Sequence, residues 1–181
     1  MSWKHISATL VCTLTLLASP VRAADLYPLA QGLHQWPASG GKLMLVVGTY
    51  QDTTSFHRSY SFYFKTAGDD AWNQVAVPES GGGQFIWNSG THGEFTLSDA
   101  IAVQRPDGVY FVVADKRMAK GAGYTDKRDV NVTWYKLILA DDDHPDDVPY
   151  QFKPAFKRSY PQSAQTVDAI LAREATLQPR T

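Results

Sequence analysis

Residues 57–66 read His-Arg-Ser-Tyr-Ser-Phe-Tyr-Phe-Lys-Thr and give the strongest structural signal in the chain. Tyr60, Phe62 and Phe64 alternate with residues of the opposite side, which is the period-two pattern of a strand with one buried face. Aromatic residues favour strands, and three rings spaced two residues apart bury a large apolar area together. We therefore expect a second sheet or a helix to cover this face.

The sequence on both sides of this strand predicts further antiparallel strands separated by turns. The apolar run 42–49 is typical of a strand buried on both faces. Residues 105–108, Arg-Pro-Asp-Gly, predict a tight hairpin turn, because Pro fixes φ and Asp-Gly adopts the backbone angles that a short hairpin needs. The remaining predicted strands are 72–77, paired with the aromatic strand, 84–87, 95–103 with a bend or bulge at 98–99, 109–114, 130–139 and, at a proline-containing edge, 148–158.

The two ends of the domain differ from its middle. Residues 24–41 are rich in turn formers and predict a leader segment that lies on the domain. Residues 162–175 predict one helix, which Ser163 caps and whose apolar side chains form a single stripe. The expected fold class is mainly β: an antiparallel sheet, sandwich or barrel-like single domain with one C-terminal α-helix.

The first 23 residues have the pattern of a secretory signal peptide. Lys4 precedes an apolar run at 6–18, and Val21 and Ala23 occupy the positions that a signal peptidase reads. The apolar run is shorter than the roughly 20 residues that span a bilayer, so we expect cleavage after Ala23 rather than membrane insertion. The predicted location is the periplasm or the extracellular medium.

The predicted mature chain, residues 24–181, is long enough for one domain with its own core. It keeps 15 of the 17 basic residues and all 18 acidic ones, a net charge of −3, which gives no reason to expect nucleic acid or an anionic membrane as a partner. The sole cysteine, Cys12, lies in the signal peptide. A disulfide, a thiolate nucleophile and a Cys-ligated metal are therefore excluded from the mature protein.

The histidines and acidic residues do not form a known metal motif. No pair of histidines has the His-x-His or His-Glu-x-x-His spacing that common zinc sites use. The loop Asp141–Asp147 holds five carboxylates and His144, but it lacks the spacing of the helix-loop-helix calcium site. A solvated turn is the favoured interpretation of this loop, with calcium binding as the alternative. We expect no metal and no cofactor.

The sequence gives no clear motif for nucleophilic hydrolysis. Gly-x-Ser-x-Gly does not occur, Ser-x-x-Lys occurs only at residues 39–42 within a turn signal, and the glycines at 81–83 are not followed by the Lys-Ser/Thr of a phosphate-binding loop. A catalytic triad can still assemble from residues that are distant in the sequence. The candidate catalytic groups are His57, His92, Glu94 and Asp99, and an enzyme is the minority interpretation.

Some aromatic residues are candidates for binding rather than for the core. Most rings must pack inside, because a domain without disulfides depends on apolar burial. Tyr63, Trp87 and Tyr124 lie on polar strand faces or beside glycine-containing loops, and His92 lies in such a loop. Exposed rings at these positions would anchor a protein partner or a carbohydrate.

Four segments follow one another in the order Ser59-Tyr-Ser-Phe-Tyr-Phe64, Asp69-Asp-Ala-Trp-Asn-Gln-Val75, Ser98-Asp-Ala100 and Val109-Tyr-Phe111. An exported, cysteine-free β protein with these segments resembles the periplasmic carbapenem self-resistance proteins, over roughly residues 42–140. The resemblance implies a periplasmic protein that protects its owner from a β-lactam without being a β-lactamase. It assigns no role to a particular residue.

The sequence therefore favours an exported binding protein of the self-resistance or toxin-immunity kind, which acts without catalysis. Its partner is expected to be an envelope protein or a small-molecule ligand, and the predicted binding residues are Tyr63, Trp87, His92 and Tyr124. An envelope-acting hydrolase and a structural envelope subunit are the alternatives. A closed pocket with two histidines near a carboxylate would favour the hydrolase, whereas an open apolar patch would favour binding.

Overall fold

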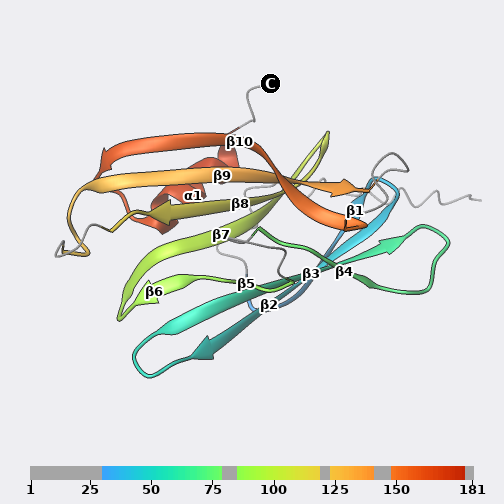
Figure 1. The fold of residues 1–181 in the computed structure, drawn as a ribbon, viewed down its shortest axis with the longest axis horizontal. Helices are drawn as coiled ribbons and strands as arrows, with labels where there is room; N and C mark the ends of the chain where they lie inside the picture. Colours follow the sequence, from blue (N-terminus) through green and yellow to red (C-terminus); the bar gives the residue numbers. More distant parts are fainter. Residues whose placement is uncertain (1–29, 79–84, 119–122, 141–147, 178–181) are drawn as a thin grey trace, which may run out of the picture.

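Two antiparallel β-sheets pack face to face, and one helix covers the outer side of the second sheet (Figure 1). This computed structural model describes residues 30–78, 85–118, 123–140 and 148–177. The architecture is a β-sandwich with a C-terminal helix, so the predicted fold class is confirmed.

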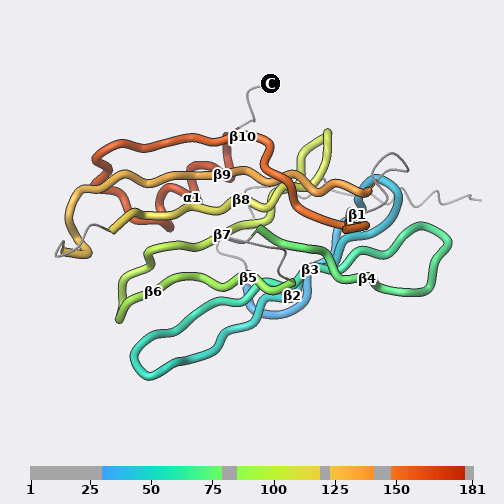
Figure 2. Tube along the Cα trace, viewed as in Figure 1, coloured from blue at the N-terminus to red at the C-terminus, as the bar shows by residue number. Residues whose placement is uncertain are grey.

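The first sheet is built around β3, the aromatic strand (Figure 2). β2 pairs antiparallel with one edge of β3, while the short strands β4 and β5 share its other edge. β1 extends the sheet beyond β2. The strands of this sheet are β1 Gly32–Ala38, β2 Gly41–Gln51, β3 Phe56–Thr66, β4 Asn73–Val75 and β5 Trp87–Asn88.

The second sheet has the spatial order β10-β9-β8-β7-β6, so each strand pairs with its neighbour in the sequence. Pro106 and Asp107 form the predicted tight turn between β7 and β8, and Gly108 closes it with a φ of 143°, a value that favours glycine. The strands are β6 Gly90–His92, β7 Phe95–Arg105, β8 Gly108–Lys116, β9 Arg128–Leu139 and β10 Tyr150–Ser163, followed by helix α1 Val167–Thr176.

The predicted aromatic core lies between the sheets. Tyr60, Phe62 and Phe64 have no exposed surface, so the predicted buried face of β3 is confirmed. The Phe62 ring lies 5.0 Å from that of Phe111 on β8 and 4.8 Å from that of Phe152 on β10. Edge-to-face contacts at these distances stabilise the core beyond simple area burial. The covering layer is therefore the second sheet.

A second core lies between the opposite face of the second sheet and α1. Val130, Val132 and Trp134 alternate along β9 and pack against helix residues that include Ile170 and Leu171. The helix thus occupies this face, and the other face of the sheet is shared between the aromatic core and solvent.

One buried carboxylate fastens α1 to the sheet. Glu174 has no exposed surface, and it accepts hydrogen bonds from Trp134 Nε1 at 2.7 Å, from Arg158 Nη1 at 2.6 Å and from the Tyr160 hydroxyl. A buried charge is tolerated only when it is paired and hydrogen-bonded in this way. These bonds explain why a glutamate belongs to the apolar side of the helix.

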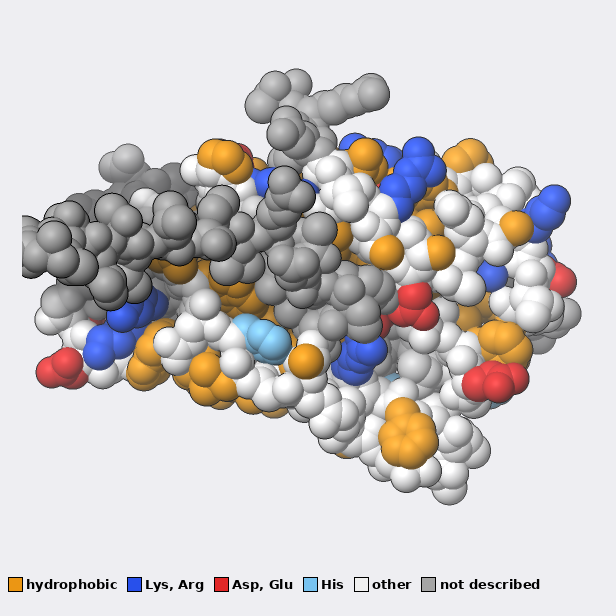
Figure 3. Space-filling view, turned by 180° about the vertical axis from the view of Figure 1, so that it is seen from behind, with side chains coloured by type: hydrophobic (Ala, Val, Ile, Leu, Met, Phe, Trp, Pro, Cys, Tyr) orange, Lys and Arg blue, Asp and Glu red, His pale blue; other side chains and the backbone are white. Residues whose placement is uncertain are grey.

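β2 differs from its prediction, because it is buried on one face rather than on both. Leu43, Leu45 and Val47 are buried, but Val46 is 36% exposed and Met44 is half-buried. No described element covers the outer side of the first sheet, so apolar residues there remain at the surface. On the face shown in Figure 3, hydrophobic side chains are dispersed among polar and charged ones.

The segment predicted as a leader contains a strand. Residues 32–38 form β1, because they pair antiparallel with residues 41–47 of β2. Gly32 and Pro37 weaken the strand signal in the sequence. An edge strand tolerates both residues, since one of its sides bonds to no neighbouring strand.

Two short strands differ in length from their predictions, and a predicted bulge is present. β4 is shorter than the predicted strand 72–77, and β5 begins at the end of the predicted strand 84–87. The irregularity predicted near Ser98 is confirmed as a shift of register opposite β7, between Gly90 and Thr91 of β6.

The C-terminal helix begins later than predicted. α1 starts at Val167, and the Thr166 side chain caps it by accepting a hydrogen bond from the Ala169 backbone N–H at 3.2 Å. Ser163, the predicted cap, is the last residue of β10. The prediction is wrong at this boundary because β10 continues through Pro161, which an edge strand tolerates.

Some predictions concern residues that the structure does not describe. The signal peptide at 1–23, the glycines at 81–83 and the acidic loop at 141–147 with its calcium alternative all lie outside the described residues. Within the described ranges, no helix has the length and hydrophobicity required to cross a membrane.

Several hydrogen bonds join the two sheets directly, and two of these links lie at Ala76 and Asp99. Ala76, just after β4, donates its N–H to the Tyr150 carbonyl and accepts from the Phe152 N–H, both at 2.9 Å. At the other link, the Tyr60 hydroxyl on β3 donates to Asp99 on β7 at 2.6 Å. The spacing of the sheets is therefore fixed by hydrogen bonds as well as by packing.

Candidate functional site

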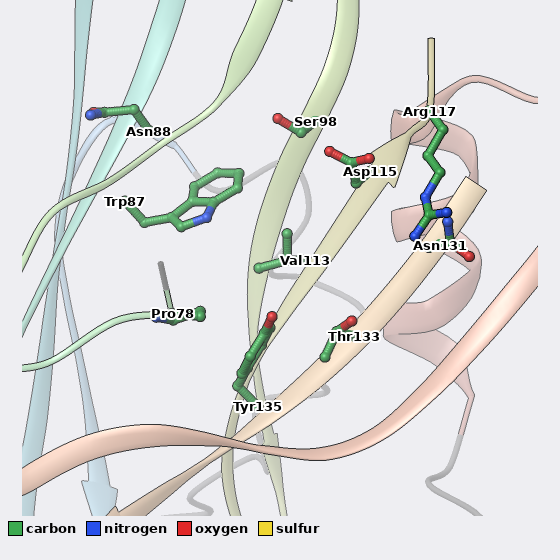
Figure 4. Close-up of a pocket in the computed structure, with 10 residues that line it drawn as sticks. All are labelled: Pro78, Trp87, Asn88, Ser98, Val113, Asp115, Arg117, Asn131, Thr133 and Tyr135. Carbon is green, nitrogen blue, oxygen red and sulfur yellow. The ribbon is translucent and has the colours of Figure 1, made fainter. Parts of the chain in front are cut away.

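A cavity lies between the two sheets beside the aromatic core. Its volume is about 410 Å³, within the range of small-molecule pockets. Strands of the second sheet form its floor, and β5 of the first sheet forms a wall (Figure 4). We call this space the inter-sheet cavity. Its lining residues are Pro78, Trp87, Asn88, Ser98, Val113, Asp115, Arg117, Asn131, Thr133 and Tyr135.

The register of three strands sets the floor of the inter-sheet cavity. Ser98, Asp115 and Asn131 lie side by side across β7, β8 and β9. Strand alternation places Val113 and then Phe111 of the aromatic core further along the same face of β8. The floor is therefore a polar continuation of the core face that the first sheet leaves uncovered.

Aromatic rings form the apolar side of the inter-sheet cavity. The Trp87 ring lies 5.6 Å from both the Tyr60 and the Phe111 rings, so the aromatic core holds it in place. Burial raises the pKa of the Tyr135 hydroxyl, and a hydrogen bond with Thr133 opposes this effect. Trp87 and Tyr135 are only half-buried, which leaves ring surface for a ligand.

A carboxylate and a guanidinium group lie at the polar side of the inter-sheet cavity. Neither the Asp115 nor the Arg117 side chain forms a hydrogen bond or an ion pair with another described residue. Although Asp115 remains solvent-accessible, the cavity walls displace part of its hydration, and this burial raises the pKa of its carboxyl group. The positive charge of Arg117 acts in the opposite direction.

A second, smaller concavity lies where the β2–β3 hairpin meets β6 and β7. Its volume is about 190 Å³, and we call it the His57 cleft. His57 Nε2 lies 2.8 Å from an Asp52 carboxylate oxygen, and Nδ1 lies 2.9 Å from the Ser89 carbonyl oxygen. His57 thus pairs with one carboxylate, whereas the hydrolase hypothesis calls for two histidines near a carboxylate.

Both ring nitrogens of His57 lie within hydrogen-bonding distance of acceptor atoms. A carboxylate and a carbonyl can only accept, so both bonds form when the imidazole is protonated. The hydrogen bond to the Ser89 carbonyl, and to a smaller extent that to Asp52, raises the pKa of His57. The hydrogen bonds that Asp52 accepts from the Thr54 N–H and from His57 lower the pKa of Asp52 to about 2. The Thr91 hydroxyl, 3.4 Å from Nδ1, donates to a backbone carbonyl instead. In this state the ring has no free lone pair to act as a general base.

A buried carboxylate of the His57 cleft, that of Asp99, joins the two sheets. Asp99 is 3% exposed and accepts hydrogen bonds from the Tyr60 hydroxyl at 2.6 Å, the Ala100 N–H at 2.8 Å and Arg58 Nη1 at 3.2 Å. Burial raises the pKa of Asp99, and these three bonds and charges act against that rise. The cleft thus holds polar groups that are bonded to each other.

The four candidate catalytic residues do not come together. His57 and Asp99 line the His57 cleft, whereas His92 stacks on Tyr124 and Glu94 lies exposed in the turn between β6 and β7. Among the described residues, no group of three His, Cys, Asp or Glu side chains is arranged as a metal site requires.

The predicted binding residues lie in three separate places. Trp87 lies in the inter-sheet cavity. The His92 and Tyr124 rings stack with centroids 4.5 Å apart, and Phe95 stacks on Tyr124 at 5.5 Å, forming what we call the ring stack. Tyr63 lies on the outer side of the first sheet, on the face of β3 opposite the core. Ligand binding by these residues stays a prediction.

Sequence reasoning missed the polar residues of the inter-sheet cavity. Arg117 belongs to a charged stretch that is typical of a surface loop. Asn131 begins an Asn-Val-Thr glycosylation sequon, which is interpreted as incidental because it lies in a predicted strand. One feature of the sequence does indicate these residues. Asn131 and Thr133 place polar side chains at alternate positions of an otherwise apolar strand, which indicates that one face of β9 is incompletely covered.

Comparison with known proteins gives one structural likeness. No protein-family model matches the chain, and no curated protein matches it. The fold is similar to that of a solved structure described as the crystal structure of CarG, with a TM-score of 0.67 and 21% sequence identity. The similarity covers 82% of this chain and 93% of that chain. At this level of identity the likeness shows a shared fold.

Proposed function

We propose that this protein is exported and protects its cell by binding a carbapenem-type β-lactam in the inter-sheet cavity, without catalysing its breakdown. One observation carries the proposal: half-buried rings converge on one cavity of ligand size with the Asp115 and Arg117 side chains, which have no hydrogen bond to another described residue. The resemblance of the sequence to carbapenem self-resistance proteins supports it. The fold, which this chain shares with the solved structure of CarG, agrees with that resemblance.

The chemistry of the two concavities favours binding over turnover. A serine nucleophile needs a base beside its hydroxyl group. Ser98 lines the inter-sheet cavity, but its hydroxyl oxygen accepts the Gly90 N–H at 2.9 Å, and no histidine is among the described lining residues. His57 lies in the other concavity with both nitrogens engaged.

The proposal is tested by comparing protection, binding and turnover. The full chain and a variant without residues 1–23 are expressed in a β-lactam-susceptible bacterium, and the inhibitory concentration of a carbapenem is measured. We expect protection from the exported form alone, saturable calorimetric binding by the mature protein and an unchanged drug concentration after incubation. Turnover of the drug would overturn the non-catalytic mechanism, and absence of both binding and protection would overturn the proposal.

A matched pair of tryptophan variants locates the site. Trp87→Ala removes the ring that forms the wall of the inter-sheet cavity, so we expect it to lose binding and protection. Trp72→Ala removes a ring that is 36% exposed and lies outside the cavity, and we expect it to retain both. Equal losses in the two variants would place the ligand elsewhere.

The ring stack favours a second candidate, an envelope protein as the partner. His92, Phe95 and Tyr124 present three stacked rings, and aromatic side chains are frequent anchors of protein interfaces. A pull-down from an envelope extract tests this candidate. Recovery of one protein by the wild type and by Trp87→Ala, but not by Tyr124→Ala, would support it, whereas recovery by all three would exclude the ring stack as the interface.

A further inference from the structure

An arginine side chain lies at the polar side of the inter-sheet cavity. The Arg117 guanidinium has no hydrogen bond or ion pair with a described residue, and Asn131 lies next to it (Figure 4). A planar guanidinium binds a carboxylate through two parallel hydrogen bonds, and a neighbouring amide can donate another. This end of the cavity is therefore suited to an anionic group of a ligand.

Asp115 restricts which anions fit. It lies between Ser98 and Asn131 in the polar row and two residues before Arg117. Burial raises the pKa of Asp115, because its charged form is incompletely solvated and gains from a hydrogen-bond donor. A second carboxylate on the ligand would meet repulsion there, whereas a hydroxyl or amine group would donate to Asp115.

Trp87 lies on the opposite side of the inter-sheet cavity from Arg117 (Figure 4). Its ring is held by Tyr60 and Phe111 and presents its free surface to the cavity. A ligand that contacts both Trp87 and Arg117 must therefore carry an apolar or ring portion on one side and an anion on the other.

We propose that the inter-sheet cavity recognises monocarboxylate ring compounds, in which Arg117 binds the carboxylate, Asp115 accepts a hydrogen bond from a hydroxyl or amine group, and Trp87 packs on the ring. The inference rests on the proposed function for the position of the site, and it adds the class of ligand. Esters and dicarboxylates fall outside this class.

Calorimetric titration of the mature protein with a carbapenem and with its carboxylate methyl ester tests the role of Arg117. We expect the wild type to prefer the acid by about 10- to 100-fold, the range for a hydrogen-bonded charge pair. Arg117→Met should weaken binding of the acid by a similar factor and leave the ester unchanged. The control Lys127→Met removes an exposed cation that lies outside the cavity, and it should change neither affinity.

The outcomes separate this inference from the proposed function. Equal wild-type affinity for the acid and the ester, with both lost in Trp87→Ala, would overturn the inference and leave the proposed function intact. Binding of neither probe would overturn both. Asp115→Asn adds a separate readout: improved binding of a dicarboxylate analogue supports the role of Asp115, and unchanged binding overturns that role.

Discussion

The His57 cleft and the inter-sheet cavity contain similar side chains that differ in their hydrogen bonding. Each holds an aspartate whose pKa is raised by burial, Asp99 in the cleft and Asp115 in the cavity. Asp99 accepts hydrogen bonds from Tyr60, Arg58 and a backbone N–H, whereas the Asp115 side chain has no hydrogen bond with a described residue. Hydrogen bonds thus compensate the loss of hydration at Asp99, whereas among the described residues only the charge of Arg117 acts in this way on Asp115.

This difference separates polar groups that hold the fold from those that are available to a ligand. A partly desolvated polar group that has no partner among the described residues is a candidate to bind a ligand, because a hydrogen bond from the ligand would replace the lost hydration. By this criterion the His57 cleft belongs to the scaffold, although its histidine and carboxylate resemble part of a catalytic site. The inter-sheet cavity, which has no histidine among its described lining residues, is the stronger candidate for binding.

The largest expected difference between the two regions is the loss of stability when the aspartate of each region is replaced by alanine. Asp99→Ala leaves the Tyr60 hydroxyl and Arg58 without their shared acceptor, so we expect the free energy of unfolding to fall by about 2–4 kcal/mol. Asp115→Ala breaks no hydrogen bond with a described residue and should change the free energy of unfolding by less than about 0.5 kcal/mol. Urea denaturation of the mature protein measures both. Similar losses in the two variants would break the comparison between the cleft and the cavity.

A smaller effect is expected from the two tyrosine hydroxyl groups. Tyr60→Phe removes the 2.6 Å hydrogen bond to buried Asp99 and should destabilise the fold by about 1–3 kcal/mol. Tyr135→Phe removes a hydroxyl from the floor of the inter-sheet cavity and should cost about 0.5 kcal/mol or less, because that group is half-exposed. Thermal unfolding compares the pair, and a greater loss for Tyr135→Phe would reverse the assignment of the two regions.

The smallest expected effect is a pH dependence from the His57 pair, because Asp52 is 49% exposed and solvent screens the interaction. Folding raises the pKa of His57 above its usual 6.5, so its contribution is complete below pH 6.5 and is lost as pH rises through the folded value. Folding lowers the pKa of Asp52 from 3.8 to about 2, so its contribution is present above pH 3.8 and is lost as pH falls toward 2.

Denaturation at about pH 6 and about pH 9 tests this dependence. Wild type should be less stable at the higher pH, and His57→Gln should lack this part of the change. Ligand affinity in the inter-sheet cavity should not follow the His57 titration, since no bond of His57 reaches Asp115 or Arg117. An identical stability profile for wild type and His57→Gln would contradict the charged pair.

Much of the fold was predictable because its signals are local. The alternating rings of residues 57–66 predict β3 and the need for a layer above it, and the Pro-Asp-Gly turn at 106–108 predicts the β7–β8 hairpin. The C-terminal helix follows from its apolar stripe. Its start was misplaced because β10 runs on through Pro161, a residue that usually ends a strand in a sequence-based prediction.

The candidate site was predictable only at Trp87, whose ring stands out beside turn-forming sequence. Asp115 and Asn131 meet through the register of β8 and β9, and Arg117 joins them just beyond the end of β8. Alternation reveals which face of a strand a residue occupies, but it does not reveal how far another sheet extends over that face. The cavity exists because the first sheet leaves part of the second uncovered.

Ala76 and Asp99 link the two sheets beside the inter-sheet cavity, since Pro78 closely follows the first and Ser98 immediately precedes the second. The opening therefore keeps its width when it is empty. A ligand that binds there loses its own translational and rotational freedom, but its binding orders few side chains or loops of the protein. The association rate should be set by diffusion and by the orientation of the ligand, and tight binding requires no slow closing of the protein.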